Sequence, residues 1–274
     1  MTTNKPTLAF FGATGGCAGA ALAAALRDGY TATALARNPD KLGKLLTASH
    51  SIPLSTISAQ LTVHPGNVKT TADVKRALIS STSPSSLVST IIFGVGSTPK
   101  MQASLLKPVT LDDPHISESG IATVLAALSE LATEGITSTA EGTKPTIVAI
   151  STTGTGGGER DVPLLLYALY HWFLQVPHAD KRKMEQLLFK AASDASIRDF
   201  FIVRPTLLTD GAARGTEKVR AGWEWGVKGV QGREKEAGPQ LGYTVGRTDV
   251  GNWIFEQLVK NGEKWEGKVI SLTY

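Results

Sequence analysis

A glycine-rich turn near the start of the chain carries the clearest chemical signal. The apolar run Leu8–Phe11 leads into Gly12-x-x-Gly15-x-x-Ala18 and then into an alanine-rich segment. Where a strand turns tightly into a helix, the first helical N–H groups lack internal acceptors and the helix dipole adds positive charge. Gly12 permits the turn, Gly15 lets a diphosphate approach, and Ala18 keeps the helix close to the strand. The motif predicts a dinucleotide site; a purely structural turn is the alternative.

Arg37 occupies the position at which dinucleotide-binding folds discriminate between NAD and NADP. It follows the β-rich run Tyr30–Ala36. An acidic residue at the end of this strand binds the ribose 2′-hydroxyl of NAD, whereas an arginine accommodates the 2′-phosphate of NADP. The alternative is an ordinary solvated charge before the Asn38-Pro39 turn. We expect NADP(H).

Ligands of a parallel sheet lie beyond the carboxyl ends of its strands, so the loops there supply the remaining expected cofactor contacts. A turn or a polar strand end is the structural alternative for the Asn67-Val68 pair and for the hydroxyl-bearing run Ser151–Thr153. From the residues alone, the expected cofactor-binding set is Gly12, Thr14, Gly15, Gly16, Cys17, Ala18, Arg37, Asn67, Val68, Phe93, Gly94, Val95, Gly96, Ser151, Thr152 and Thr153.

Strand and helix patterns alternate along the chain. Apolar or β-branched runs predict strands at 8–11, 30–36, 60–64, 87–92, 145–150, 198–205 and 268–272. Helices are expected after the glycine turn and at 38–46, 71–79, 116–131, 161–176, 178–189 and 248–259. We expect residues 49–58 to form a polar loop and 98–115 an irregular insertion. The alternation predicts a Rossmann-like, doubly wound parallel sheet with helices on both faces.

The chain reads as a single domain, 1–274, with residues 206–242 as a substrate cap. This segment is rich in glycine and charge and contains Trp223 and Trp225. Two tryptophans in a glycine-bounded segment suit a hydrophobic cap over a substrate. A surface brace is the alternative.

Composition excludes several classes of protein. The 274 residues are 42% hydrophobic, carry a net charge of +4 and include one cysteine, Cys17. No disulfide or cysteine-based zinc site can form within the chain, and no basic run suits nucleic acid. The apolar stretch Leu164–Val176 is too short to span a bilayer. We expect a cytoplasmic protein without metal, membrane or nucleic-acid partner, binding a small molecule as a monomer or homodimer.

Several motifs occur together in one order: Gly12-Ala13-Thr14-Gly15, Arg37-Asn38-Pro39, Phe93-Gly94-Val95-Gly96, Lys181-x-x-x-Glu185 and Val203-Arg204-Pro205-Thr206. With them the chain resembles the NmrA-like, atypical short-chain dehydrogenase/reductase family, in particular fungal NAD(P)-binding members, some linked to secondary metabolism. The resemblance implies a Rossmann fold and NADP, and it adds Lys181 and Pro205 to the expected cofactor contacts.

The chain departs from this family's usual Tyr-x-x-x-Lys pair. In that pair the tyrosine protonates the substrate oxygen, and the neighbouring lysine lowers its pKa. Lys181 matches the lysine, but Pro177 stands four residues earlier. The catalytic candidates are therefore Lys181, His178, Tyr167 and His171, with Tyr170 or the hydroxyls of Ser151 and Thr152 as further substitutes. As alternatives, the two tyrosines and His171 are core residues, and His178 only begins a helix.

These observations predict an NADP-dependent oxidoreductase that reduces a small hydrophobic, aromatic or polyketide-like substrate, with fungal secondary metabolism as the setting that the resemblance implies. Two alternatives remain open. A non-catalytic NADP-binding redox sensor would account for the missing tyrosine. A non-redox isomerase or cyclase could use the dinucleotide as a scaffold.

Overall fold

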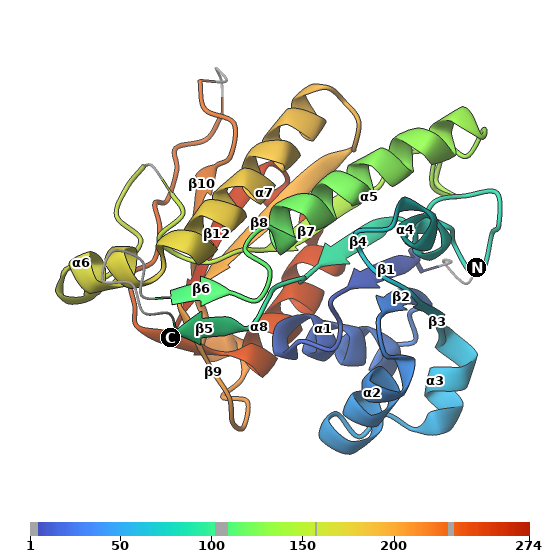
Figure 1. Cartoon of the computed structure of the whole chain (residues 1–274), viewed down its shortest axis with the longest axis horizontal. Helices are drawn as coiled ribbons and strands as arrows, with labels where there is room; N and C mark the ends of the chain where they lie inside the picture. The colour runs from blue at the N-terminus through green and yellow to red at the C-terminus, as the bar shows by residue number, and fades with distance from the viewer. Residues whose placement is uncertain (1–4, 102–108, 157, 230–232) are drawn as a thin grey trace.

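The structure is a computed structural model that describes residues 5–101, 109–156, 158–229 and 233–274, without the side chains of Pro99, Leu166, Leu169 and His171. Within these residues, eight strands form a central sheet in the order β10-β12-β8-β7-β4-β1-β2-β3 (Figure 1). All neighbouring pairs are parallel except β10 and β12. The sheet confirms the predicted Rossmann-like fold, with one antiparallel edge strand that the sequence did not predict.

The strands are short and mostly buried. Those of the central sheet are β1 (Leu8–Phe11), β2 (Ala32–Ala36), β3 (Leu61–Pro65), β4 (Thr90–Phe93), β7 (Thr146–Ile150), β8 (Asp199–Pro205), β10 (Arg220–Trp225) and β12 (Lys268–Thr273). Two further pairs lie outside it: antiparallel β5 (Pro99–Met101) with β6 (Val109–Leu111), and parallel β9 (Leu207–Thr209) with β11 (Thr244–Gly246).

Helices connect these strands. They are α1 (Gly16–Arg27), α2 (Pro39–Lys44), α3 (Leu54–Gln60), α4 (Thr71–Leu78), α5 (Ile116–Thr133), α6 (Leu164–Phe173), α7 (Gln175–Ser193) and α8 (Arg247–Trp253). Asn38 caps α2 by accepting the Lys41 N–H at 3.0 Å, and Pro39 is its first residue, as predicted. π-helical turns continue α2 over Leu45–Ser49 and α8 over Ile254–Val259. No helix in the described part of the chain is long and apolar enough to cross a membrane.

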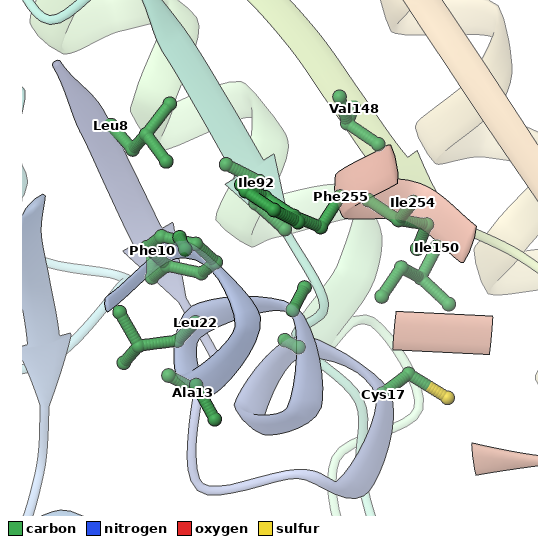
Figure 2. Close-up of a cluster of buried hydrophobic side chains, with 14 of the residues drawn as sticks. Leu8, Phe10, Ala13, Cys17, Leu22, Ile92, Val148, Ile150, Ile254 and Phe255 are labelled. Carbon is green, nitrogen blue, oxygen red and sulfur yellow. The ribbon is translucent and has the colours of Figure 1, made fainter. Parts of the chain in front are cut away.

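Each face of the sheet packs on its own hydrophobic core. One core holds side chains of α1 and α8 against β1, β4 and β7. In Figure 2, Phe10 of β1 lies beside Leu22 of α1, and Ile92 of β4 lies beside Phe255. The second core packs α4, α5 and α7 on the opposite face. This two-sided covering explains why the strands read as continuous apolar runs.

Three local expectations were wrong. Residues 49–58 are not a loop, because Pro53 starts α3, whose Ile57 packs on the first core. The fourth strand begins at Thr90 rather than Leu87, since Leu87 instead bridges Ile79 and Thr139 outside the main ladder. The insertion 98–115 contains β5 and β6, although its residues 102–108 lie outside the described structure.

The segment 206–242, which we predicted as a cap, contributes β9 and the edge strand β10. Trp223 and Trp225 meet edge to face at 5.3 Å, and the Lys268 ammonium lies 3.8 Å from the Trp223 ring centre. This packing describes a brace at the sheet edge. Whether other parts of the segment cover a substrate stays a prediction.

Candidate active site

The glycine turn joins β1 to α1 as the motif predicts. Gly12 has φ +84°, a conformation that favours glycine, and a Cβ there would lie 2.7 Å from the carbonyl carbon of Gly94. The Gly15 N–H donates to the Gly12 carbonyl at 2.9 Å, which closes the turn. Gly15 is the N-cap of α1, so the helix offers the N–H groups of its first residues, beginning at Gly16, to an anion.

A cleft of about 540 Å³ opens at this turn, along the carboxyl ends of β1 to β4. Its volume and its bare backbone fit a dinucleotide. It is lined by nine of the predicted cofactor-binding residues: Gly12, Thr14, Gly15, Arg37, Asn67, Val68, Gly94, Val95 and Gly96. Sequence reasoning missed two others from the carboxyl-terminal part of the chain, Leu208 and Arg247.

Four other residues that we predicted as cofactor contacts do not line the cleft but lie behind its wall. Phe93 is fully buried, and its ring packs 6.5 Å from that of Phe11. Cys17 and Ala18 are buried in α1, and burial raises the pKa of the Cys17 thiol to about 12. Gly16 lies directly under the Arg247 side chain, to which a Cβ would come within 2.5 Å. For these residues a direct cofactor contact stays a prediction.

Arg37 is exposed at the rim of the cleft, one residue after β2 ends. Within the described residues, no carboxylate lies within ion-pair distance of its guanidinium. A guanidinium at a cleft rim is a ready partner for a phosphate because its planar fork matches phosphate oxygens.

Lys181 projects from α7 to the centre of the carboxyl edge. Its ammonium donates to the carbonyls of Ile150 at 2.8 Å and Val95 at 3.1 Å, so two of its three donors join the ends of β7 and β4. Burial lowers the pKa of Lys181 to about 8, and the carboxylates of Asp180 and Glu185 only partly oppose this shift. The remaining donor can serve a ribose or substrate hydroxyl.

Ser151 belongs to a buried network rather than to the cleft wall. Its hydroxyl donates to Glu185 at 2.6 Å, and Arg204 donates to both oxygens of the same carboxylate at 2.7 and 3.0 Å. Thr155 also donates to Glu185, at 3.0 Å. The network fixes the loop after β7. The backbone of Pro205, another predicted contact, helps here, because its carbonyl accepts the Thr153 N–H at 3.1 Å.

Tyr170 brings a phenol hydroxyl next to the loop that follows β7. Pro177 lies in the first turn of α7, four residues before Lys181. Tyr170 comes from the preceding helix, α6, and its hydroxyl lies 3.3 Å from that of Thr152. A positioned tyrosine hydroxyl can act as a general acid, and a neighbouring threonine hydroxyl can orient it.

The other catalytic candidates are placed differently. His178 is buried, and its ring packs against the ring of Tyr170 with the ring centres 5.2 Å apart, so it helps to position that tyrosine. Tyr167 is 44% exposed on α6. The side chain of His171 lies outside the described structure. The sequence analysis gave Tyr170 only as a further candidate for the proton donor, because its approach to Thr152 depends on how α6 packs.

An apolar cavity of about 490 Å³ adjoins this hydroxyl pair. It lies between α6, the β5–β6 pair and the start of β9. Its walls are Lys100, Met101, Val109, Thr153, Val162, Pro163, Tyr170, Phe173, Leu174, Thr206, Leu207, Gly242 and Tyr243. Almost all of the surface inside is hydrocarbon, which suits an apolar ligand. Among the described residues, no cluster of three histidine, cysteine or acidic side chains is placed to hold a metal ion.

Comparison with known proteins agrees with this geometry. Residues 12–261 match the model of a family described as NAD(P)H-binding. The chain is 38% identical to the reductase pytE of Aspergillus terreus, with 100% of both chains covered. It is 37% identical to the oxidase pynE of Aspergillus niger, over 98% of this chain and 99% of that one.

A solved structure from Bacillus halodurans, described as an NAD-dependent epimerase/dehydratase, has the same fold. It superposes with a TM-score of 0.58 at 18% identity, over 97% of this chain and 93% of that one. The family match and the two full-length fungal relatives agree on one class of protein. The chain therefore belongs to the NAD(P)H-binding family, as an NAD(P)-dependent oxidoreductase with a Rossmann-like fold.

Proposed function

We propose that this protein is an NADP(H)-dependent reductase of a small hydrophobic carbonyl compound, aromatic or polyketide-like in character. One observation carries the proposal: the dinucleotide cleft and the apolar cavity lie along the same carboxyl edge of the sheet, with the Tyr170–Thr152 hydroxyl pair beside the cavity. Arg37 at the cleft rim supports NADP over NAD. The setting we propose is fungal secondary metabolism, in line with two relatives from Aspergillus species, a reductase and an oxidase.

The roles of the residues follow from their positions. The glycine turn and α1 bind the diphosphate, Arg37 the 2′-phosphate, and Lys181 a ribose hydroxyl. When bound, the reduced nicotinamide supplies a hydride. The Tyr170 hydroxyl donates a proton to the substrate oxygen, and the Thr152 hydroxyl orients it. The buried Glu185–Arg204 pair holds the loop that carries Thr152, and the cavity excludes water from the apolar part of the substrate.

NADPH consumption tests this function directly. We expect turnover with hydrophobic aromatic ketones or quinones, faster with NADPH than with NADH, and little with small polar ketones of the same reactivity. Cofactor binding without turnover across such a panel would favour the redox sensor. Product formed with no change in the cofactor's oxidation state would favour the isomerase or cyclase.

A further inference from the structure

Arg247, the first residue of α8, lies over the glycine turn although it is far from the turn in the sequence. Its side chain lines the dinucleotide cleft and covers Gly16, the first residue of α1. The Arg247 side chain is 34% exposed, and its guanidinium lies 2.9 Å from a carboxylate oxygen of Asp210, whose side chain is 88% exposed. A guanidinium thus lies beside a helix N-terminus, which is itself suited to binding anions. Its partner is an exposed carboxylate, and an exposed ion pair contributes little free energy.

The small sheet of β9 and β11 brings these two residues together. The strands are parallel, and Thr209 pairs with Gly246 at their carboxyl ends. Asp210 and Arg247 are the next residues of each strand, so they emerge side by side. Their pairing is therefore a product of register and not of chance contact between long side chains.

The packing of α8 on α1 fixes Arg247 over the turn. A Cβ at Gly251 would lie 2.4 Å from the Cys17 carbonyl oxygen, so the two helices approach closely at Gly251, one turn after Arg247, and at Cys17, the residue after Gly16. Asp249 is fully buried and accepts the N–H groups of Arg214 at 2.8 Å and Gly215 at 3.0 Å. The loop that carries Asp210 is thereby tied to α8, and the start of α8 is rigid.

From this arrangement we infer that Arg247 is a second cationic contact for the cofactor's diphosphate, and that Asp210 is the anion it pairs with when no cofactor is bound. The inference rests on the proposed function, since it requires the dinucleotide to bind at the glycine turn. A guanidinium can bind a diphosphate through two N–H groups at once, which makes a stronger pair than its contact with the exposed carboxylate of Asp210. Cofactor binding exchanges one partner of Arg247 for another.

The role differs from that of Arg37 in what it recognises. The diphosphate is common to NADPH and NADH, whereas the 2′-phosphate is present only in NADPH. A contact at the diphosphate therefore contributes equally to both cofactors. It also contributes to ADP-ribose, and it contributes nothing to adenosine 2′-monophosphate.

Calorimetry with four ligands and three variants tests the inference. We expect Arg247→Gln to weaken NADPH, NADH and ADP-ribose alike, each about tenfold, and to leave adenosine 2′-monophosphate unchanged. Asp210→Asn removes the competing charge and should tighten NADPH and NADH by about threefold. The matched control is Arg198→Gln, at an arginine that forms an exposed 2.8 Å ion pair with Glu266 just before the amino end of β8.

The outcomes distinguish a failure of the proposed function from a failure of the role inferred for Arg247. If the unaltered protein binds neither nicotinamide cofactor, the proposed function fails and the inference with it. If it binds both and Arg247→Gln binds them with unchanged affinity, the inference alone is overturned and Arg247 merely covers α1. Should Arg247→Gln fold poorly, Asp210→Asn decides, because an exposed carboxylate has no structural role to lose: unchanged or weaker cofactor binding contradicts the exchange.

Discussion

The two sides of the carboxyl edge are built in different ways. On the proposed cofactor side, the wall that would meet the diphosphate is largely backbone: the glycine turn after β1 and the loop after β4, in contact through Gly12 and Gly94, with the side chains of Arg37 and Arg247 also lining the cleft. On the proposed substrate side, the walls are side chains from α6, the β5–β6 pair and β9. Backbone geometry binds a phosphate group whatever the neighbouring side chains are, whereas a side-chain wall sets its own substrate. The same fold can thus keep its cofactor while its substrate changes.

The largest expected effect comes from breaking the backbone wall. Gly12→Val should abolish binding of NADPH and NADH, because a Cβ at this position meets the Gly94 backbone at 2.7 Å and the residue has φ +84°. Calorimetry measures the loss, and circular dichroism checks that the protein is folded.

Gly43→Ala is the control, since nothing lies within 4 Å of a Cβ at Gly43 in α2. Undiminished cofactor affinity in a folded Gly12→Val protein would show that the cleft is not where the dinucleotide binds.

On the substrate side we expect a change in turnover without a change in cofactor binding. Tyr170→Phe should lower kcat by about a hundredfold or more, because it removes the proton donor and leaves the cavity wall in place. Affinity for NADPH should stay the same. Steady-state kinetics with a substrate that the native protein reduces gives the first value, and calorimetry the second.

Tyr167→Phe is the matched change on the same helix, at a side chain that is 44% exposed. It should reduce kcat far less. A larger loss in Tyr167→Phe than in Tyr170→Phe would move the proton donor to Tyr167, as one of the predictions from the sequence had it.

A smaller effect is expected where the two sides meet, at Lys181. Burial lowers its pKa to about 8, and the groups that face it are Asp180, Glu185 and the Cys17 thiol, whose pKa of about 12 keeps it neutral. Lys181 is therefore charged below pH 8 and neutral above it, so NADPH affinity should fall as pH rises through 8. Calorimetry on both sides of this pH measures the change.

Lys181→Gln should remove this pH dependence, whereas Lys183→Gln should keep it, because Lys183 is an exposed lysine paired with Glu118 at 3.1 Å. A pH profile that persists in Lys181→Gln would assign the titration to another group.

The contrast between the two sides also explains what the sequence could predict. The β1–α1 turn is contiguous, so residue types such as Gly12 and Gly15 determine it, and the parallel sheet followed from the alternation of strands and helices. Tyr170 and Arg247 depend on long-range packing: one on how α6 lies over Thr152, the other on the register of β9 with β11. The helix α3 was missed for the same reason, since Ile57 joins a core that only tertiary structure creates.

Arg37 offers the most direct test of the central claim, that the chain binds NADP(H) at the glycine turn with Arg37 on the 2′-phosphate. The measurement is calorimetric affinity for NADPH and NADH in the native protein and in Arg37→Ala. We predict that the native protein prefers NADPH and that Arg37→Ala loses about ten- to hundredfold in NADPH affinity while NADH affinity is unchanged. An equal loss for both cofactors, or no binding of either by the folded native protein, would contradict it.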